Sequence, residues 1–103
     1  MRPAKLEEAD VRRELADLPH WSLRSGKLLR EVRFGDFVEA FGFMSSMALV
    51  SEALNHHPEW TNVYQRVVIE LSTHDAGGIT KLDLDWARRA ERLIERAAVD
   101  RIG

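Results

Sequence analysis

The chain has 103 residues, 45% of them hydrophobic and 31% charged, with a formal net charge of -2 at pH 7. These values predict one globular domain over residues 1–103 and exclude a disordered chain. They give no electrostatic reason for direct binding to nucleic acid or to an anionic membrane, and the absence of cysteine excludes disulfides, thiol catalysis and cysteine-ligated zinc.

The N-terminal residues 1–8 lack the apolar run of a secretory signal, and no segment reads as long and apolar enough to span a bilayer. We therefore expect a cytoplasmic protein without membrane contact. Residues 6–15 predict a short helix with Leu6, Val11 and Leu15 near one side. Pro19 closes this segment, because the residue before a proline avoids helical angles.

A tight hairpin is predicted at Ser25-Gly26, a two-residue turn ending in Gly between the strand-like runs 21–24 and 27–34. Alternate residues of the second run are apolar from Leu28 to Phe34, with Arg30 as the exception. One face of this strand should therefore be mostly buried.

The most apolar helix should begin after Asp36, which caps it, and Glu39 completes a capping-box pattern. Pro58 forbids continuation, so this helix should end near Leu54 or Asn55. A wide apolar stripe covers residues 37–50. We interpret its Phe and Met side chains first as ordinary core, and second as a surface for another subunit.

The clearest strand covers residues 62–73, where apolar and polar residues alternate and Gln65 is the polar exception on the inner row. A break near residues 60–62 is one way to divide it into two strands. Gly77-Gly78 predicts a turn, and Thr80 with Asp83 predicts a second cap before an amphipathic helix to about Val99. The hairpin and the half-polar alternation favour an α+β fold, with a mostly antiparallel sheet and helices packed on one face.

Three of the four histidines, His56, His57 and His74, lie at boundaries of the predicted elements. Imidazole has an unperturbed pKa near neutrality, so it both donates and accepts protons at physiological pH. Helix and strand ends at the same edge of a sheet lie close together, so we expect the three rings to meet in one dry pocket. His20 is expected to be a surface residue or a hydrogen-bonded core residue.

Two other chemistries compete with acid–base catalysis. Three imidazoles can hold a catalytic zinc ion, but neighbouring residues rarely ligate one ion together and the helical i, i+4 spacing is absent. Ser72-Thr73-His74 places hydroxyls beside an imidazole, but neighbours along a strand point to opposite faces and no strand–nucleophile–helix elbow is present. A metal-free acid–base site is the preferred interpretation.

Glu52, His56-His57-Pro58, Tyr64, His74 and Asp83, at this spacing, resemble the signature of the pterin-4a-carbinolamine dehydratases. The flanking sequence at 58–64, 71–75 and 78–83 also resembles that of this family, and the resemblance covers residues 18–96. It implies a four-stranded antiparallel sheet backed by helices, and a homodimer or homotetramer. It also implies a hydro-lyase that needs no cofactor, converts 4a-hydroxytetrahydropterin to quinonoid dihydropterin and so recycles the pterin of aromatic amino acid hydroxylases.

The resemblance also assigns roles. His56 and His74 would donate and accept protons, His57 would mainly position the pterin, and Glu52 would hydrogen-bond an imidazole. Asp83 would cap the last helix, orient a catalytic histidine, or both. Tyr64 would anchor its strand by packing and a hydroxyl bond. The expected substrate-binding residues are Asn55, His56, His57, Trp60, Ser72, Thr73, His74 and Asp75, with no metal ligand among them.

A second function belongs to a different class. Animal proteins that resemble this chain also act as dimerisation cofactors of a homeodomain transcription factor, through the helical surface that makes their tetramer. The apolar stripe at 37–50 would suit such a non-enzymatic interaction module. Three intact histidines argue against a purely structural role, because packing alone has no use for them.

Overall fold

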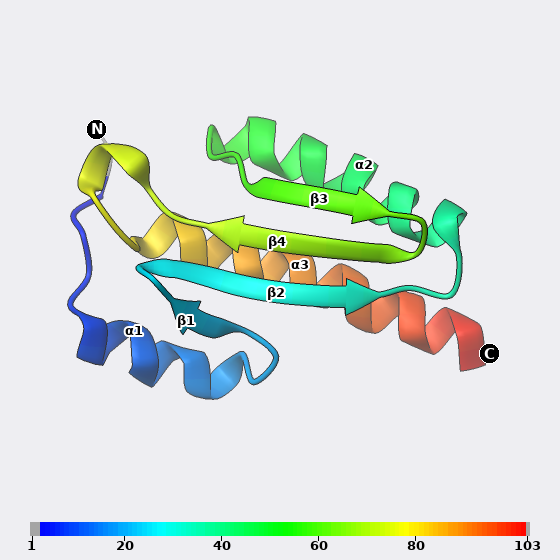
Figure 1. Cartoon of the computed structure of the whole chain (residues 1–103), viewed down its shortest axis with the longest axis horizontal. Helices are drawn as coiled ribbons and strands as arrows, with labels where there is room; N and C mark the ends of the chain where they lie inside the picture. The colour runs from blue at the N-terminus through cyan, green and yellow to red at the C-terminus, as the bar shows by residue number, and fades with distance from the viewer. Residues whose placement is uncertain (1–2, 103) are drawn as a thin grey trace.

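The computed structural model describes residues 3–102, and its centre is one antiparallel sheet (Figure 1). The strands are β1 (Ser22–Arg24), β2 (Lys27–Arg33), β3 (Glu59–Val63) and β4 (Arg66–Leu71). Their order in the sheet is β1-β2-β4-β3, and each neighbouring pair is antiparallel. The predicted α+β class with a four-stranded antiparallel sheet is confirmed.

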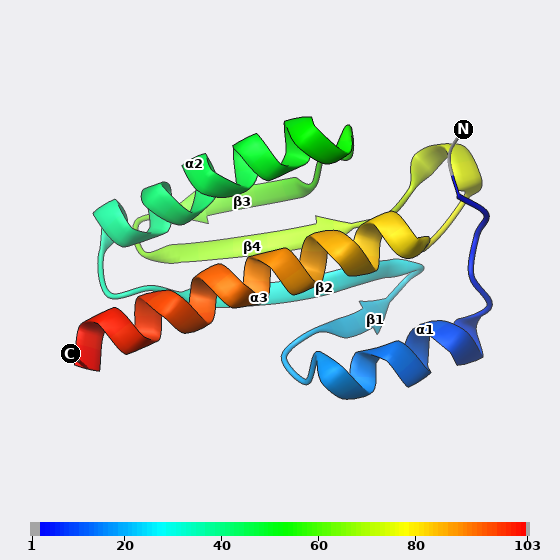
Figure 2. The same cartoon turned by 180° about the vertical axis from the view of Figure 1, so that it is seen from behind.

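The helices are α1 (Glu8–Glu14), α2 (Phe37–Leu54) and α3 (Lys81–Ile102), with short 3-10 turns η1 (Leu15–Asp17) and η2 (His74–Ala76). Figures 1 and 2 show α2 and α3 together on one face of the sheet, while α1 lies beside β1 at its edge. Helix α3 extends beyond the predicted end near Val99. The predicted one-sided packing is confirmed.

The β1–β2 hairpin turns at Ser25 and Gly26, both with positive φ (51° and 77°), as the favoured type I′ turn of a two-residue hairpin requires. Arg30, the polar exception on the inner face, is half-buried there. Its Nε donates to Glu91 Oε1 at 2.7 Å, and Trp21 Nε1 donates to the same oxygen at 2.8 Å. The cation is tolerated inside because a carboxylate of α3 pairs with it.

The predicted break near residues 60–62 is wrong. The chain turns instead at Tyr64 and Gln65, where Tyr64 has φ 52°. Asn62 holds this turn, because its Nδ2 donates to the carbonyl oxygens of Tyr64 at 3.0 Å and Arg66 at 2.9 Å. Tyr64 is 62% exposed at the tip of the turn, so it does not anchor the strand by packing.

Both ends of α2 follow the prediction. Asp36 Oδ1 accepts from Glu39 N at 2.8 Å, Glu39 Oε1 accepts from Gly35 N at 2.8 Å, and Asn55 ends the helix with a left-handed φ of 51°. These contacts satisfy backbone groups that a helix terminus leaves unpaired.

The side chains of α2 divide into two faces. Ala40, Phe43 and Met47 are buried in the core. The ordinary-core interpretation is wrong for Phe37 and Phe41, because α2 exposes four large apolar side chains, Phe37 (45%), Val38 (78%), Phe41 (55%) and Leu49 (75%). We call these four residues the α2 patch.

Helix α2, with its 18 residues, is also by length and composition apolar enough to cross a membrane. This contradicts the expectation that no segment is long enough. Core helices of soluble proteins pass the same test, and the inner face of α2 packs against β4 and α3.

The crossover through α2 positions the candidate site. Strands β2 and β3 run in the same direction, and β4 returns between them. Because Glu59, the first residue of β3, pairs with Glu70 near the end of β4, residues 55–58 and 72–75 lie at the same end of the sheet. Two segments that carry the histidines are thereby brought together.

Candidate active site

A buried hydrogen-bond network joins the two histidine-bearing segments to α3. Asp83 is fully buried, and its Oδ1 lies 2.5 Å from His56 Nε2. Its Oδ2 accepts from Thr73 Oγ1 at 2.8 Å and from the backbone N–H of Thr80 at 2.9 Å. Asp83 therefore makes both contacts that the sequence led us to expect, one with the N-terminus of α3 and one with an imidazole.

The network fixes which nitrogen of His56 carries a proton. The Asp83 carboxylate already faces two other donors, so Nε2 is the donor in that contact and neutral His56 has its lone pair on Nδ1. The ring is only 4% exposed, yet no buried side-chain nitrogen or oxygen in the described residues lacks a partner. Within the described residues His56 Nδ1 has no hydrogen-bond partner, so it cannot be one of the buried atoms and must reach the surface.

His57 pairs with a different carboxylate. The left-handed Asn55 turns the chain back after α2, which brings His57 Nε2 within 2.5 Å of Glu52 Oε2 on the last helical turn. The His57 side chain is 54% exposed and that of Glu52 77%. Glu52 thus contacts an imidazole as expected, but this pair is open to solvent, which contradicts the expectation of a dry pocket in the single chain. Asn55 itself is exposed beside it.

His74 is the first residue of η2 and its ring is exposed. It borders a cavity of about 270 Å³ between the end of β4 and the β1–β2 turn, lined by Ser25, Gly26, Lys27, Ser72, Thr73, His74, Gly77 and Gly78. Ser72 is half-buried on this wall, and Asp75 is exposed on the loop. His74 and the residues that follow β4 therefore line the same cavity.

Thr73 differs from its expected role. Its hydroxyl contacts both Thr80 Oγ1 (2.7 Å) and Asp83, and its N–H donates to the Gly78 carbonyl at 2.8 Å. The residue is 2% exposed. Thr73 therefore supports the frame of the site, and its polar hydrogens are not available to a ligand.

Trp60 is half-buried and packs edge-to-face on Trp86, with ring centroids 5.9 Å apart. It also borders a cavity of about 430 Å³ together with Pro58, Glu59, Thr61, Val68 and Glu70. It serves the core and lines an opening next to His57-Pro58.

Lys27 is a residue near the site that the sequence did not single out. Its Nζ lies 3.0 Å from Glu59 Oε1, so the ion pair crosses β4 between the cavity at His74 and the cavity at Trp60. The hydrogen bond and charge of Glu59 raise the pKa of Lys27 above its ordinary 10.5. Only the strand register brings these residues together, because they lie far apart along the chain.

The described residues contain no group of three or more His, Asp or Glu side chains able to hold a metal ion. What the site offers instead is three imidazoles at one end of the sheet, two of them in contact with carboxylates. Such groups are suited to moving protons.

Residues 4–93 match a family model described as pterin 4 alpha carbinolamine dehydratase. A protein of Prochlorococcus marinus named "Putative pterin-4-alpha-carbinolamine dehydratase" is 47% identical over 96 residues, covering 93% of this chain and 100% of that protein. A protein of the same name from Solibacter usitatus is 51% identical over 89 residues, covering 86% and 94%.

Among solved structures, the chain is similar to a transcriptional coactivator/pterin dehydratase from Brucella melitensis. The TM-score is 0.84 at 40% sequence identity, with 86% of this chain and 97% of the other covered. The similarity thus extends from the sequence to the arrangement of the helices and strands.

Proposed function

The chain belongs to the pterin 4 alpha carbinolamine dehydratase family, and from this premise we propose that it is a hydro-lyase acting on 4a-hydroxytetrahydropterin. The product is quinonoid dihydropterin, and the protein would serve the recycling of a pterin used by aromatic amino acid hydroxylases. The observation that carries the proposal is the trio of imidazoles at one end of the sheet, with Asp83 and Glu52 as partners of His56 and His57.

The reaction needs only proton transfers. An acid protonates the hydroxyl on carbon 4a, the carbon–oxygen bond breaks, and water leaves. The lone pair of the adjacent ring nitrogen forms the new carbon–nitrogen double bond, and a base removes the proton from that nitrogen. Because the substrate supplies the electron pair, neither a cofactor nor a covalent intermediate is required. Positioned acid and base groups typically contribute about 10²–10⁴-fold to such steps.

The exposures of the rings support a division of roles that differs from the one expected from the sequence. His57 and His74 are exposed, so they are the groups we assign to proton exchange with the substrate. His56 presents only Nδ1, and its contact with Asp83 makes that nitrogen an acceptor in the neutral ring. We assign His56 to holding a donor group of the pterin, and the backbone at Ser72 and Asp75 to its amide edge.

The test is the rate of dehydration of a chemically generated 4a-hydroxytetrahydropterin, followed by absorbance. His57→Gln and His74→Gln should each lower kcat by at least tenfold, by loss of the acid–base contribution. His20 is exposed outside the site, so His20→Gln is the matched control and should keep full activity. Unchanged rates in both site variants, with folding intact, would refute the assignment.

A second function is favoured by the α2 patch. Exposed Phe and Leu side chains gathered on one helix mark surfaces that bind another protein. The similar Brucella protein is named both a coactivator and a dehydratase. We propose self-association through this patch, as a homodimer or homotetramer, with a non-enzymatic protein partner as the alternative occupant.

Light scattering tests this interface. Phe41→Glu should convert the assembly to monomers, because a charge would be buried in an apolar contact. Ser46→Glu adds the same charge to an exposed position of α2 outside the patch and should leave the mass unchanged. A wild-type protein that is monomeric at high concentration would refute self-association.

A further inference from the structure

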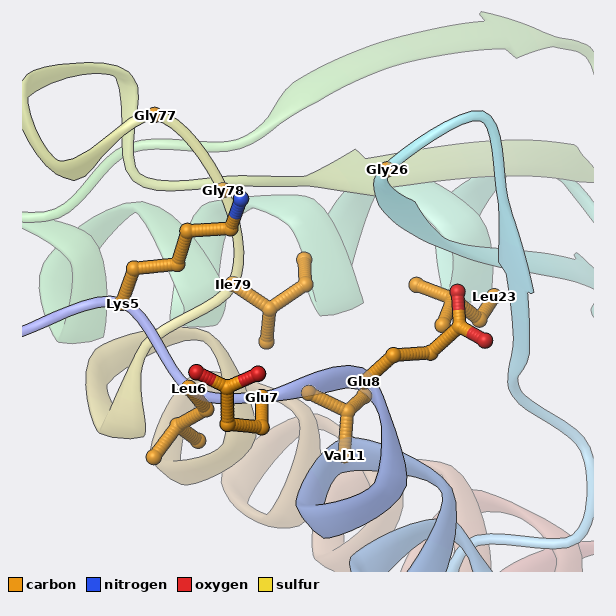
Figure 3. Close-up of a pocket in the computed structure, with 10 residues that line it drawn as sticks. All are labelled: Lys5, Leu6, Glu7, Glu8, Val11, Leu23, Gly26, Gly77, Gly78 and Ile79. Atoms are coloured by element: carbon orange, nitrogen blue, oxygen red, sulfur yellow. The ribbon is translucent and has the colours of Figure 1, made fainter.

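The segment just before α1, represented by Lys5 and Leu6, lies against residues 78–79, at the end of the loop that carries His74. Leu6 N donates to the carbonyl oxygen of Ile79 at 2.8 Å, which ties the two segments together by their backbones. Figure 3 shows Lys5 of this segment extended toward Gly78, with Ile79 beside it. The same residues line a cavity of about 340 Å³ that shares Gly26, Gly77 and Gly78 with the cavity at His74.

The loop of His74 is closed at its base by backbone bonds. Thr73 N donates to Gly78 O at 2.8 Å, and Gly78 N donates to Thr73 O at 3.3 Å. His74 is the first residue inside this closed loop. The segment Gly78-Ile79 is therefore bound to Thr73 on one side and to Leu6 on the other.

Lys5 covers Gly78 closely. A Cβ added to Gly78 would lie 2.8 Å from Lys5 Cε and 3.2 Å from Cδ, so the aliphatic stem occupies the space that a side chain would need. Lysine stems commonly cover apolar surface while the ammonium stays in water. Here the stem lies against Gly78, one of the two residues whose backbone bonds close the loop.

We propose that Lys5 and Leu6 act as positioning residues for His74, by holding the closing side of its loop. This proposal rests on the proposed function for the role of His74 in the reaction, but the physical coupling of segment to loop does not. The effect on the reaction follows because small displacements of a proton donor cost far more in rate than in stability. The rival explanation is that the segment only stabilises the fold, since the Leu6 side chain packs on the core.

Three variants separate these explanations. Leu6→Pro removes the N–H that Ile79 O accepts, together with the side chain. Leu6→Ala removes the side chain and keeps the N–H. Glu8→Pro is the control, because it places a proline at the first position of α1, where proline is well tolerated. The preceding residue, Glu7, has a ψ of 148°, which suits the residue before a proline.

We expect Leu6→Pro to lower kcat for carbinolamine dehydration at least fivefold below Leu6→Ala, with KM changed less than twofold. Hydrogen exchange at the Thr73 and Gly78 amides should accelerate by a similar factor in Leu6→Pro alone. Glu8→Pro should match the wild type in both measurements. Equal kcat and equal exchange in Leu6→Pro and Leu6→Ala would overturn the proposal.

Lys5 provides a milder pair in case Leu6→Pro does not fold. Lys5→Met keeps an unbranched stem without the charge and should retain wild-type exchange at Gly78, whereas Lys5→Ala should speed it about twofold to fivefold. Indistinguishable exchange in the two variants would overturn the role of the stem. If the wild type shows no dehydratase activity, the proposed function fails, while the exchange measurements still decide the coupling.

Discussion

Replacing Asp83 with Asn perturbs the junction on which the candidate site depends. The carboxylate accepts from three donors, on His56, Thr73 and Thr80, in a fully buried position. The Asn amide keeps one acceptor oxygen, which Thr80 N–H requires, and its NH₂ group then faces His56 Nε2, which had been a donor. The Thr80 N–H cannot change its polarity, so His56 must move its proton from Nε2 to Nδ1.

The size of the effect follows from the number of bonds. A hydrogen bond to a charged group contributes about 1.5–3 kcal/mol and a neutral one about 0.5–1.5 kcal/mol, so three weakened bonds cost about 3 kcal/mol. Relief from burying a charge offsets part of this. We expect Asp83→Asn to lower the free energy of unfolding by about 2–4 kcal/mol, measured by urea denaturation with tryptophan fluorescence.

Nitrogen-15 spectra of the imidazoles report the second consequence, the change of the His56 tautomer. Asp85→Asn is the matched control, because Asp85 lies on the same helix, half-buried, outside this network. It should change stability by less than about 0.5 kcal/mol. A loss below about 1 kcal/mol in Asp83→Asn, or an Nε2–H tautomer that persists, would show that Asp83 does not hold His56 in this way.

Three further predictions concern the frame of the site. Trp86→Phe, which shortens a fully buried side chain, should lower the free energy of unfolding by about 2 kcal/mol in a urea titration; an unchanged midpoint would contradict the packing. Tyr64→Gly should leave stability within about 1 kcal/mol of the wild type, because glycine adopts the φ of 52° freely; a larger loss would mean that the Tyr64 side chain contributes. Because folding raises the pKa of Lys27, its ion pair with Glu59 stabilises the protein below pH 10.5 and this contribution is lost as pH rises through the raised value. The difference in urea midpoint between wild type and Lys27→Met should therefore be constant at neutral pH and shrink only above pH 10.5, and a difference that shrinks near pH 7 would contradict this.

Local signals predicted the elements well because each has a nearby physical cause. Asp36 and Glu39 begin α2, Pro58 forces its end, and Ser25-Gly26 sets the hairpin. The turn at Tyr64 escaped prediction because a residue with an aromatic side chain rarely takes positive φ, and Asn62 stabilises it through contacts that become visible only in three dimensions.

The site was predicted in part for the same reason. Their places at element ends indicated that the histidine-bearing segments lie at one end of the sheet, but not that His56 would be buried against Asp83 while His57 stays open beside Glu52. That division depends on the left-handed turn at Asn55, which directs consecutive side chains to opposite environments. The exposure of Phe41 could not be predicted from the periodicity of apolar residues either, because a wide apolar stripe does not show which part of it packs on the sheet.

The most direct test of the central claim is a titration of protein carrying nitrogen-15 in its histidines with 7,8-dihydrobiopterin. A pterin held at this end of the sheet should shift the ring signals of His56, His57 and His74 with one common binding curve and leave His20 unmoved. Saturation without any change at those three rings, or equal shifts at His20, would show that the pterin does not bind at this end of the sheet.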